Sequence, residues 1–137
     1  MPEPAGVARG LLDTSVVIDL EAIDASHLPA EVAVSALTMA ELAAGPHATT
    51  DPDERARRQD RLQRAEATFD PLPFDAEASR VYGRVFASVI AAGRKARGAC
   101  AADLLIAATA VAAGLPLYTR NGDDFEGLRD LLEVIVV

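Results

Sequence analysis

Cysteine, histidine and tryptophan are nearly missing from this chain of 137 residues, which has one cysteine, two histidines and no tryptophan. The single cysteine, Cys100, excludes a disulfide within the chain and fits a reducing compartment. His27 and His47 lie in loops near prolines and lack the spacing of a zinc site. Metal chemistry that relies on thiolate or imidazole ligands is therefore poorly supported.

Long apolar segments are also absent. The first ten residues contain no apolar run of the length that a secretory signal needs. Residues 99–113 are nearly all apolar, but about 15 residues are too few for a membrane span, and Asp103 interrupts them. Glycine-rich nucleotide-binding motifs and the Gly-x-Ser-x-Gly motif of hydrolases are missing as well. We therefore expect a cytoplasmic protein with no membrane partner.

Aromatic residues make up only 4% of the chain, whereas half of all residues are hydrophobic, so the expected core is aliphatic. The length predicts one domain over residues 10–137, preceded by a flexible lead over residues 1–9 that is rich in proline. The net charge is −8, but it is unevenly distributed. Residues 51–97 hold ten basic and eight acidic residues, which gives this segment a net charge of +2.

Apolar runs and helical patterns alternate along the chain. We predict strands over residues 10–13, 31–35, 116–119 and 133–137. We predict helices over residues 16–23, 36–44, 52–69, 75–92 and 100–113, the first of them capped by Thr14 or Ser15. Strands that alternate with helices indicate an α/β fold, in which a parallel sheet carries helices on both faces.

Four acidic residues occur in apolar or strand-end settings, namely Asp13, Glu41, Asp103 and Asp124. In a parallel sheet, ligands bind where the strands end, and all four elements can direct their acids to that edge. Two carboxylates about 5 Å apart repel each other by ~3 kcal/mol at an effective dielectric constant of ~20. Such a cluster therefore requires either protonation or a bound cation, and hard divalent cations prefer carboxylate ligands.

Each acid also has an ordinary structural explanation. Asp13 can cap a helix, Glu41 can be a solvated helix residue, and Asp124 can be part of a turn. Asp103 can stabilise the start of its helix through the helix dipole. The ordinary explanation is weakest for Asp103, because its helical neighbours are apolar on every face.

Four segments together resemble the PIN-domain ribonucleases, and more narrowly the VapC toxins of bacterial type II toxin–antitoxin systems. These segments are Leu-Leu-Asp-Thr-Ser-Val at 11–16, Ser-Ala-Leu-Thr-Met-Ala-Glu-Leu at 35–42, Ala-Asp-Leu-Leu-Ile-Ala-Ala-Thr-Ala at 102–110 and Tyr-Thr-Arg-Asn-Gly-Asp-Asp-Phe at 118–125. The resemblance covers about residues 10–137. It implies a PIN-like three-layer α/β/α fold with a central, mainly parallel sheet.

The resemblance also implies an activity and a set of site residues. The expected activity is a Mg²⁺-dependent endoribonuclease, with Mn²⁺ as a possible substitute. The catalytic acids would be Asp13, Glu41, Asp103 and Asp124, with Asp13 and Asp103 as direct metal ligands. Thr14 and Thr119 match supporting hydroxyls, and either Asn121 or Asp124 can be the residue that reaches the metal.

The expected partners are RNA, a small VapB-type antitoxin and a second copy of the chain. The alternative functions are a non-catalytic PIN-like module that binds RNA or protein, a DNA-directed nuclease and a phosphatase. Two basic clusters could contact RNA: Arg57, Arg61 and Arg64 on one predicted helix face, and Arg94, Lys95 and Arg97 in a loop. A solvated face, or a surface that packs against the antitoxin or a second subunit, explains the first cluster equally well.

Overall fold

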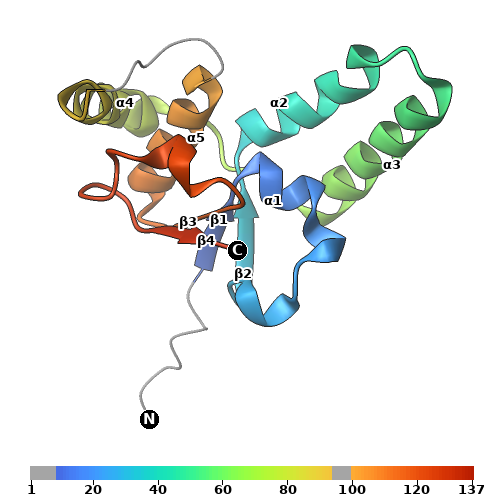
Figure 1. Ribbon diagram of the computed structural model, residues 1–137, viewed down its shortest axis with the longest axis horizontal. Coiled ribbons are helices and arrows are strands. Elements are labelled where there is room, and N and C mark those ends of the chain that lie inside the picture. The colour runs from blue at the N-terminus through green and yellow to red at the C-terminus, as the bar shows by residue number, and fades with distance from the viewer. Residues whose placement is uncertain (1–8, 94–99) are drawn as a thin grey trace.

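The computed structural model describes residues 9–93 and 100–137. Its four strands form one parallel sheet in the order β2-β1-β3-β4 (Figure 1). The strands are β1 (Arg9–Leu12), β2 (Glu31–Val34), β3 (Leu117–Thr119) and β4 (Val134–Val136). Each one lies within a residue or two of a strand predicted from the sequence, and the expected α/β fold with a parallel sheet is confirmed.

Within the described residues, five α-helices connect and flank these strands: α1 (Thr14–Ile18), α2 (Ala36–Ala44), α3 (Pro52–Thr68), α4 (Ala76–Ala91) and α5 (Cys100–Ala113). The side chain of Asp51 caps α3, in which Pro52 takes the first position, and the side chain of Asp75 caps α4. Short 3₁₀ turns occur at η2 (Leu20–Ala22), η3 (Ala25–His27), η4 (Gly45–Ala48) and η5 (Gly122–Phe125).

The helix predicted over residues 16–23 is wrong in its bounds and in its cap. Asp13, rather than Thr14 or Ser15, is the capping residue, and its carboxylate accepts from the Thr14 N–H. The helix ends at Ile18 and continues only as the 3₁₀ turn η2. Val16-Val17-Ile18 is a run of β-branched residues, which lose side-chain freedom in a helix and support it poorly.

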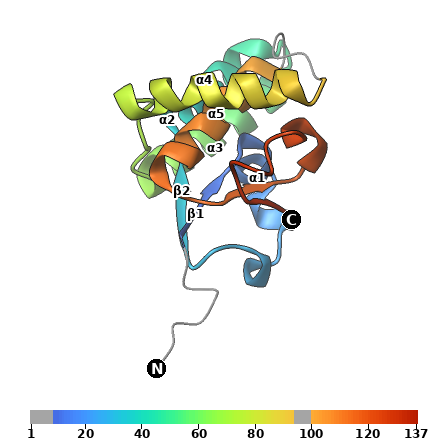
Figure 2. The same ribbon diagram turned by 90° about the vertical axis from the view of Figure 1, so that its left-hand side faces the viewer.

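The helices cover both faces of the sheet, and each face has its own apolar core (Figures 1 and 2). Leu11 and Leu117 point to the face covered by α4 and α5, where they join Val85 and Ile106. Leu12, the neighbour of Leu11, points to the opposite face with residues of α1, α2 and α3. This alternation is the period of two that a strand imposes, and it produces the three-layer α/β/α arrangement.

The carboxyl ends of β1, β2 and β3 lie at one edge of the sheet, because all three strands are parallel. The N–H of Asp13 donates to the carbonyl of Tyr118 at 2.8 Å, which holds the ends of β1 and β3 together. Helix α5 leads into β3 through a short loop, so its first turn lies at this same edge. The sequence segments that carry the four acids therefore meet where the strands end.

The aromatic ring of Tyr118 lies over Gly10, where a side chain would collide with it. A Cβ atom added to Gly10 would lie 2.4 Å from the ring of Tyr118, the residue that follows Leu117 in β3.

Within the part of the chain that the structure describes, no helix is long and apolar enough to cross a membrane.

Candidate active site

Asp13 lies at the end of β1, and its side chain is only 4% exposed. Three donors hold its carboxylate. The Thr14 N–H donates to Oδ1 at 2.9 Å, and the hydroxyls of Ser15 and Thr119 donate to Oδ2 at 2.9 and 2.8 Å. A buried charge is costly unless it is hydrogen-bonded, and these three bonds supply that compensation.

The two hydroxyls that hold Asp13 are themselves fixed by the backbone. Ser15 Oγ accepts from the Arg120 N–H at 3.1 Å, and Thr119 Oγ1 accepts from the Asn121 N–H at 3.0 Å. The segment after β3 is thereby bonded to the start of α1 around one carboxylate. Asn121 takes part in this arrangement through its backbone, and its side chain is exposed.

Glu41 is an exposed residue of α2, and one of its carboxylate oxygens is held in place from α1. The hydroxyl of Thr14 donates to Glu41 Oε1 at 2.6 Å. Thr14 therefore serves both acids, since its N–H binds Asp13 and its hydroxyl binds Glu41.

Asp103 lies in the first turn of α5 and is half-buried. The pKa of its carboxyl is raised from the ordinary value of 3.8 to about 7, first by burial and then by the negative charges of Asp13, Asp124 and Glu41, in that order. Each of the other three acids is thus close enough to act on Asp103. The fold brings all four predicted acids into one electrostatic site.

The structure places the other predicted residues as follows. Thr14 and Thr119 lie within the acid cluster as expected, whereas Arg94, Lys95 and Arg97 lie outside the described residues. The sequence alone indicated only a helix cap at Ser15. It also did not single out Thr38, whose hydroxyl lies 2.9 Å from the Thr14 hydroxyl. A hydroxyl directly after an acid motif was the available signal for Ser15.

The donor set suits a hard divalent cation. Among residues 9–93 and 101–137, no three acidic, histidine or cysteine side chains form a ready-made metal site. Mg²⁺ does not require one, because it usually takes one or two carboxylates and completes its shell with water and substrate phosphate. Burial and the nearby negative charges raise the pKa of Asp103, and a bound cation would offset both effects by stabilising its ionised form.

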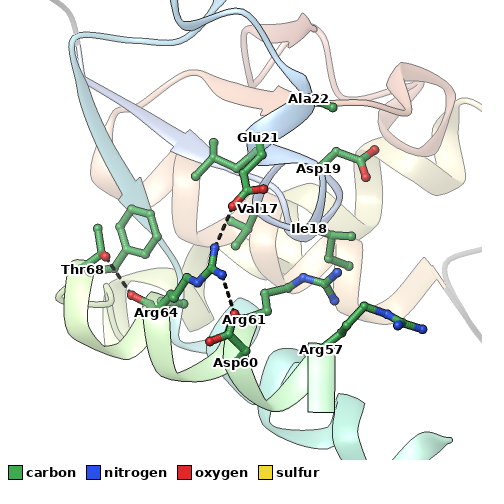
Figure 3. A pocket seen from close by; sticks show the side chains of 13 residues that line it. Val17, Ile18, Asp19, Glu21, Ala22, Arg57, Asp60, Arg61, Arg64 and Thr68 are labelled. Carbon is green, nitrogen blue, oxygen red and sulfur yellow. Dashed lines mark hydrogen bonds and ion pairs between the residues drawn. The ribbon is translucent and has the colours of Figure 1, made fainter. Parts of the chain in front are cut away.

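The three arginines predicted to share a face of α3 do so. Arg57, Arg61 and Arg64 line a groove of about 460 Å³ between α3 and the segment from α1 to η2 (Figure 3). Arg64 forms ion pairs with Glu21 and Asp60. Arg61 also lines a smaller hollow that contains Thr14 and Glu41, so this face reaches the edge of the acid site.

Comparison with known proteins shows the family to which this chain belongs. Residues 10–131 match the PIN domain family. The chain belongs to that family. The PIN domain is 36% identical to Ribonuclease VapC5 of Mycobacterium tuberculosis (strain ATCC 25618 / H37Rv) over 133 residues, which cover 95% of each chain. It is 34% identical to Ribonuclease VapC4 of the same strain over 134 residues, which cover 96% of this chain and 98% of that one.

A solved structure agrees with these relatives. The PIN domain superimposes on a chain of VapBC-5 from Mycobacterium tuberculosis, a member of the VapBC family of toxin–antitoxin systems, with a TM-score of 0.83. The two are 37% identical, and the match covers 95% of this chain and 99% of that one. The PIN-like α/β/α fold and the resemblance to VapC-type PIN toxins are therefore confirmed.

The raised pKa of Asp103 predicts a specific effect of pH on stability. Between about pH 4 and pH 7 this carboxyl binds more protons in the folded than in the unfolded chain, so it makes the free energy of unfolding fall as the pH rises. Asp103→Asn removes this contribution. Without added metal, we expect the variant to be more stable than the wild type at pH 8, by roughly 1–2 kcal/mol because solvent screens the half-buried charge.

Urea unfolding at pH 4 and pH 8 measures the effect. The difference in unfolding free energy between Asp103→Asn and the wild type should be near zero at pH 4 and positive at pH 8. A difference that does not change with pH would contradict the raised pKa of Asp103. Asp130→Asn, which removes an exposed charge outside the acid cluster, is the matched control and should show no such trend.

Proposed function

We propose that this PIN domain is a metal-dependent endoribonuclease and the toxin of a type II toxin–antitoxin system. One observation carries the proposal: the carboxyl of Asp103 is partly buried beside the negative charges of three other acids from three other elements, and burial and these charges together raise its pKa. The sequence identity of 36% and 34% to proteins named as VapC ribonucleases supports RNA as the substrate. A non-catalytic binding module would gain nothing from this arrangement, which disfavours that alternative.

The cofactor that we propose is Mg²⁺, with Mn²⁺ as a substitute. Asp13 and Asp103 would hold it, because Asp13 is fixed by three donors and Asp103 carries the charge that most needs a counter-ion. When bound, such an ion lowers the pKa of coordinated water and offsets negative charge on the phosphate. Asp124, whose charge also acts on Asp103, could help to hold a second ion.

The protein's own contribution to the reaction is to orient water and substrate. Glu41 is exposed to the solvent, yet the bond from Thr14 fixes one of its oxygens, so its other oxygen can accept a hydrogen bond from an attacking water. Attack on phosphorus in line with the leaving 3′-oxygen breaks that P–O bond. The products are a 5′-phosphate on one RNA fragment and a 3′-hydroxyl on the other.

An antitoxin of the VapB type is the partner that we propose. The support is the match to VapBC-5, which is described as a member of a toxin–antitoxin family. A cluster of four carboxylates attracts a cation, so an arginine of the antitoxin inserted near Asp13 and Asp103 would neutralise the site and block it. The homodimer expected from the resemblance stays a prediction.

The basic face of α3 is our proposed path for RNA toward the acids. Asp60 and Glu21 partly neutralise Arg64, and Glu54 pairs with Arg57. Within the described part of the chain, Arg61 forms no ion pair with a carboxylate, and it borders the hollow beside Glu41. Arg61 is therefore the residue of this face best placed to receive a phosphate.

Removing the charge of Asp103 should abolish cleavage. Asp103→Asn keeps the size of the side chain, so the fold should persist while RNA cleavage falls by at least about a hundredfold. The measurement is cleavage of an RNA oligonucleotide with added Mg²⁺, beside a DNA of the same sequence. Asp130→Asn is the control and should cleave at the native rate. A folded Asp103→Asn variant with native activity would remove Asp103 from the mechanism.

Expression in bacteria tests the toxin assignment. Strong expression of the wild type should arrest growth, coexpression of the cognate antitoxin should relieve the arrest, and Asp103→Asn should be harmless. Immunoblots should show equal amounts of both soluble proteins. Normal growth with abundant soluble wild type would contradict the toxin assignment and leave the nuclease to be judged by cleavage alone.

Charge removal on α3 tests the RNA path. The triple change Arg57→Ala, Arg61→Ala and Arg64→Ala should weaken RNA binding and reduce its salt dependence by about 0.7 in log–log slope for each lost phosphate contact. The single change Arg61→Ala should account for more of the loss than Arg57→Ala. Arg84→Ala on α4 is the matched control. Unchanged affinity and slope in the folded triple variant would exclude this path.

A further inference from the structure

Three hydroxyls form a continuous hydrogen-bonded chain that ends on Glu41. Ser35 Oγ donates to Thr38 Oγ1 at 3.3 Å, Thr38 Oγ1 and Thr14 Oγ1 are 2.9 Å apart, and Thr14 Oγ1 donates to Glu41 Oε1 at 2.6 Å. These residues come from the end of β2, from α2 and from α1. The chain runs from the interior of the protein to the exposed carboxylate of the acid site.

The direction of every bond in this chain follows from its last member. An ionised carboxylate can only accept, so the single proton of the Thr14 hydroxyl points to Glu41. Thr14 can then only accept from Thr38, which fixes the Thr38 proton. Thr38 in turn accepts from Ser35. Hydrogen bonds aligned in one direction polarise one another, and here they all donate toward the carboxylate.

The inner end of the chain is rigidly anchored. Ser35 and Thr38 are both fully buried, and Ser35 Oγ accepts from the Thr38 N–H at 3.0 Å as the cap of α2. The backbone beside Ser35 bonds to Leu72 on both sides, since Leu72 donates to Val34 at 2.9 Å and accepts from Ala36 at 2.8 Å. Movement of this end would break the sheet bridge and the helix cap together.

We infer that Thr38 is a positioning residue for the reaction, acting on Glu41 through Thr14. A threonine in a helix divides between two side-chain rotamers, and Thr14 is in the first turn of α1. The bond from Thr38 selects the rotamer in which the Thr14 hydroxyl meets Glu41. The inference rests on the proposed function, because it gives Glu41 a role in cleavage.

Removal of the Thr38 hydroxyl tests this role. Thr38→Val keeps the shape of the side chain, Thr38→Ser keeps the hydroxyl, and Thr38→Ala replaces the valine variant if that one fails to fold. The measurements are the single-turnover cleavage rate with the protein in saturating excess over RNA, and the RNA dissociation constant without metal. We expect the variant without the hydroxyl to cleave about tenfold more slowly, with RNA affinity within about twofold of the wild type, and the serine to restore the rate.

The same Thr38 substitution made in a Thr14→Val protein shows whether Thr38 acts through Thr14 or by a general effect on the structure. In a Thr14→Val protein the row of hydrogen bonds from Ser35 to Glu41 is already interrupted. Adding Thr38→Val to that protein should therefore slow cleavage by no more than about twofold. An equal slowing in both backgrounds, a native rate for Thr38→Val, or a serine variant as slow as the valine would each overturn the inference. If the wild type cleaves RNA, these results concern Thr38 alone, whereas an inactive wild type would remove the proposed function and this inference with it.

Discussion

The burial of carboxyl groups beside one another is the constraint on which this structure depends. Four carboxylates from separate elements share one edge of the sheet, and the pKa of Asp103 is raised by its burial and by the negative charges of the other three. The fold tolerates this arrangement because Asp13, the most deeply buried of the four, is compensated by three donors. The rest of the edge is built around that residue, since the donors come from the start of α1 and the end of β3.

The acids differ in their properties because their surroundings differ. Asp13 is surrounded by hydrogen bonds, Asp103 by apolar neighbours and negative charge, and Glu41 by solvent with one fixed oxygen. Groups of the same chemical type thereby become a fixed, hydrogen-bonded carboxylate, a partly buried carboxyl with a raised pKa and an exposed carboxylate with one oxygen held in place. This separation of roles by environment is typical of sites in which paired carboxylates perform acid–base and metal chemistry.

Much of the fold could be predicted from the sequence, because the strands are apolar runs and the long helices have clear caps such as Asp51 and Asp75. The four acids were also found, since a charge in an apolar segment is conspicuous. The bounds of the short α1 were predicted wrongly because the pattern around Val16 does not reveal where a β-branched helix ends. Thr38 was missed for a different reason: a buried threonine in a helix has no sequence signal that distinguishes a packed side chain from a hydrogen-bonded one.

Asp13 has a structural role as well as a place among the acids, and this affects which substitution should be used to make an inactive variant. Its carboxylate caps α1 and also accepts from Thr119, so a substitution there removes a helix cap and a link between strands along with the charge. A protein disabled at Asp13 would be a distorted substitute for the native molecule in crystallography or in partner capture. Position 103 is the better choice, because an uncharged side chain there relieves repulsion and leaves the surrounding hydrogen bonds as they are.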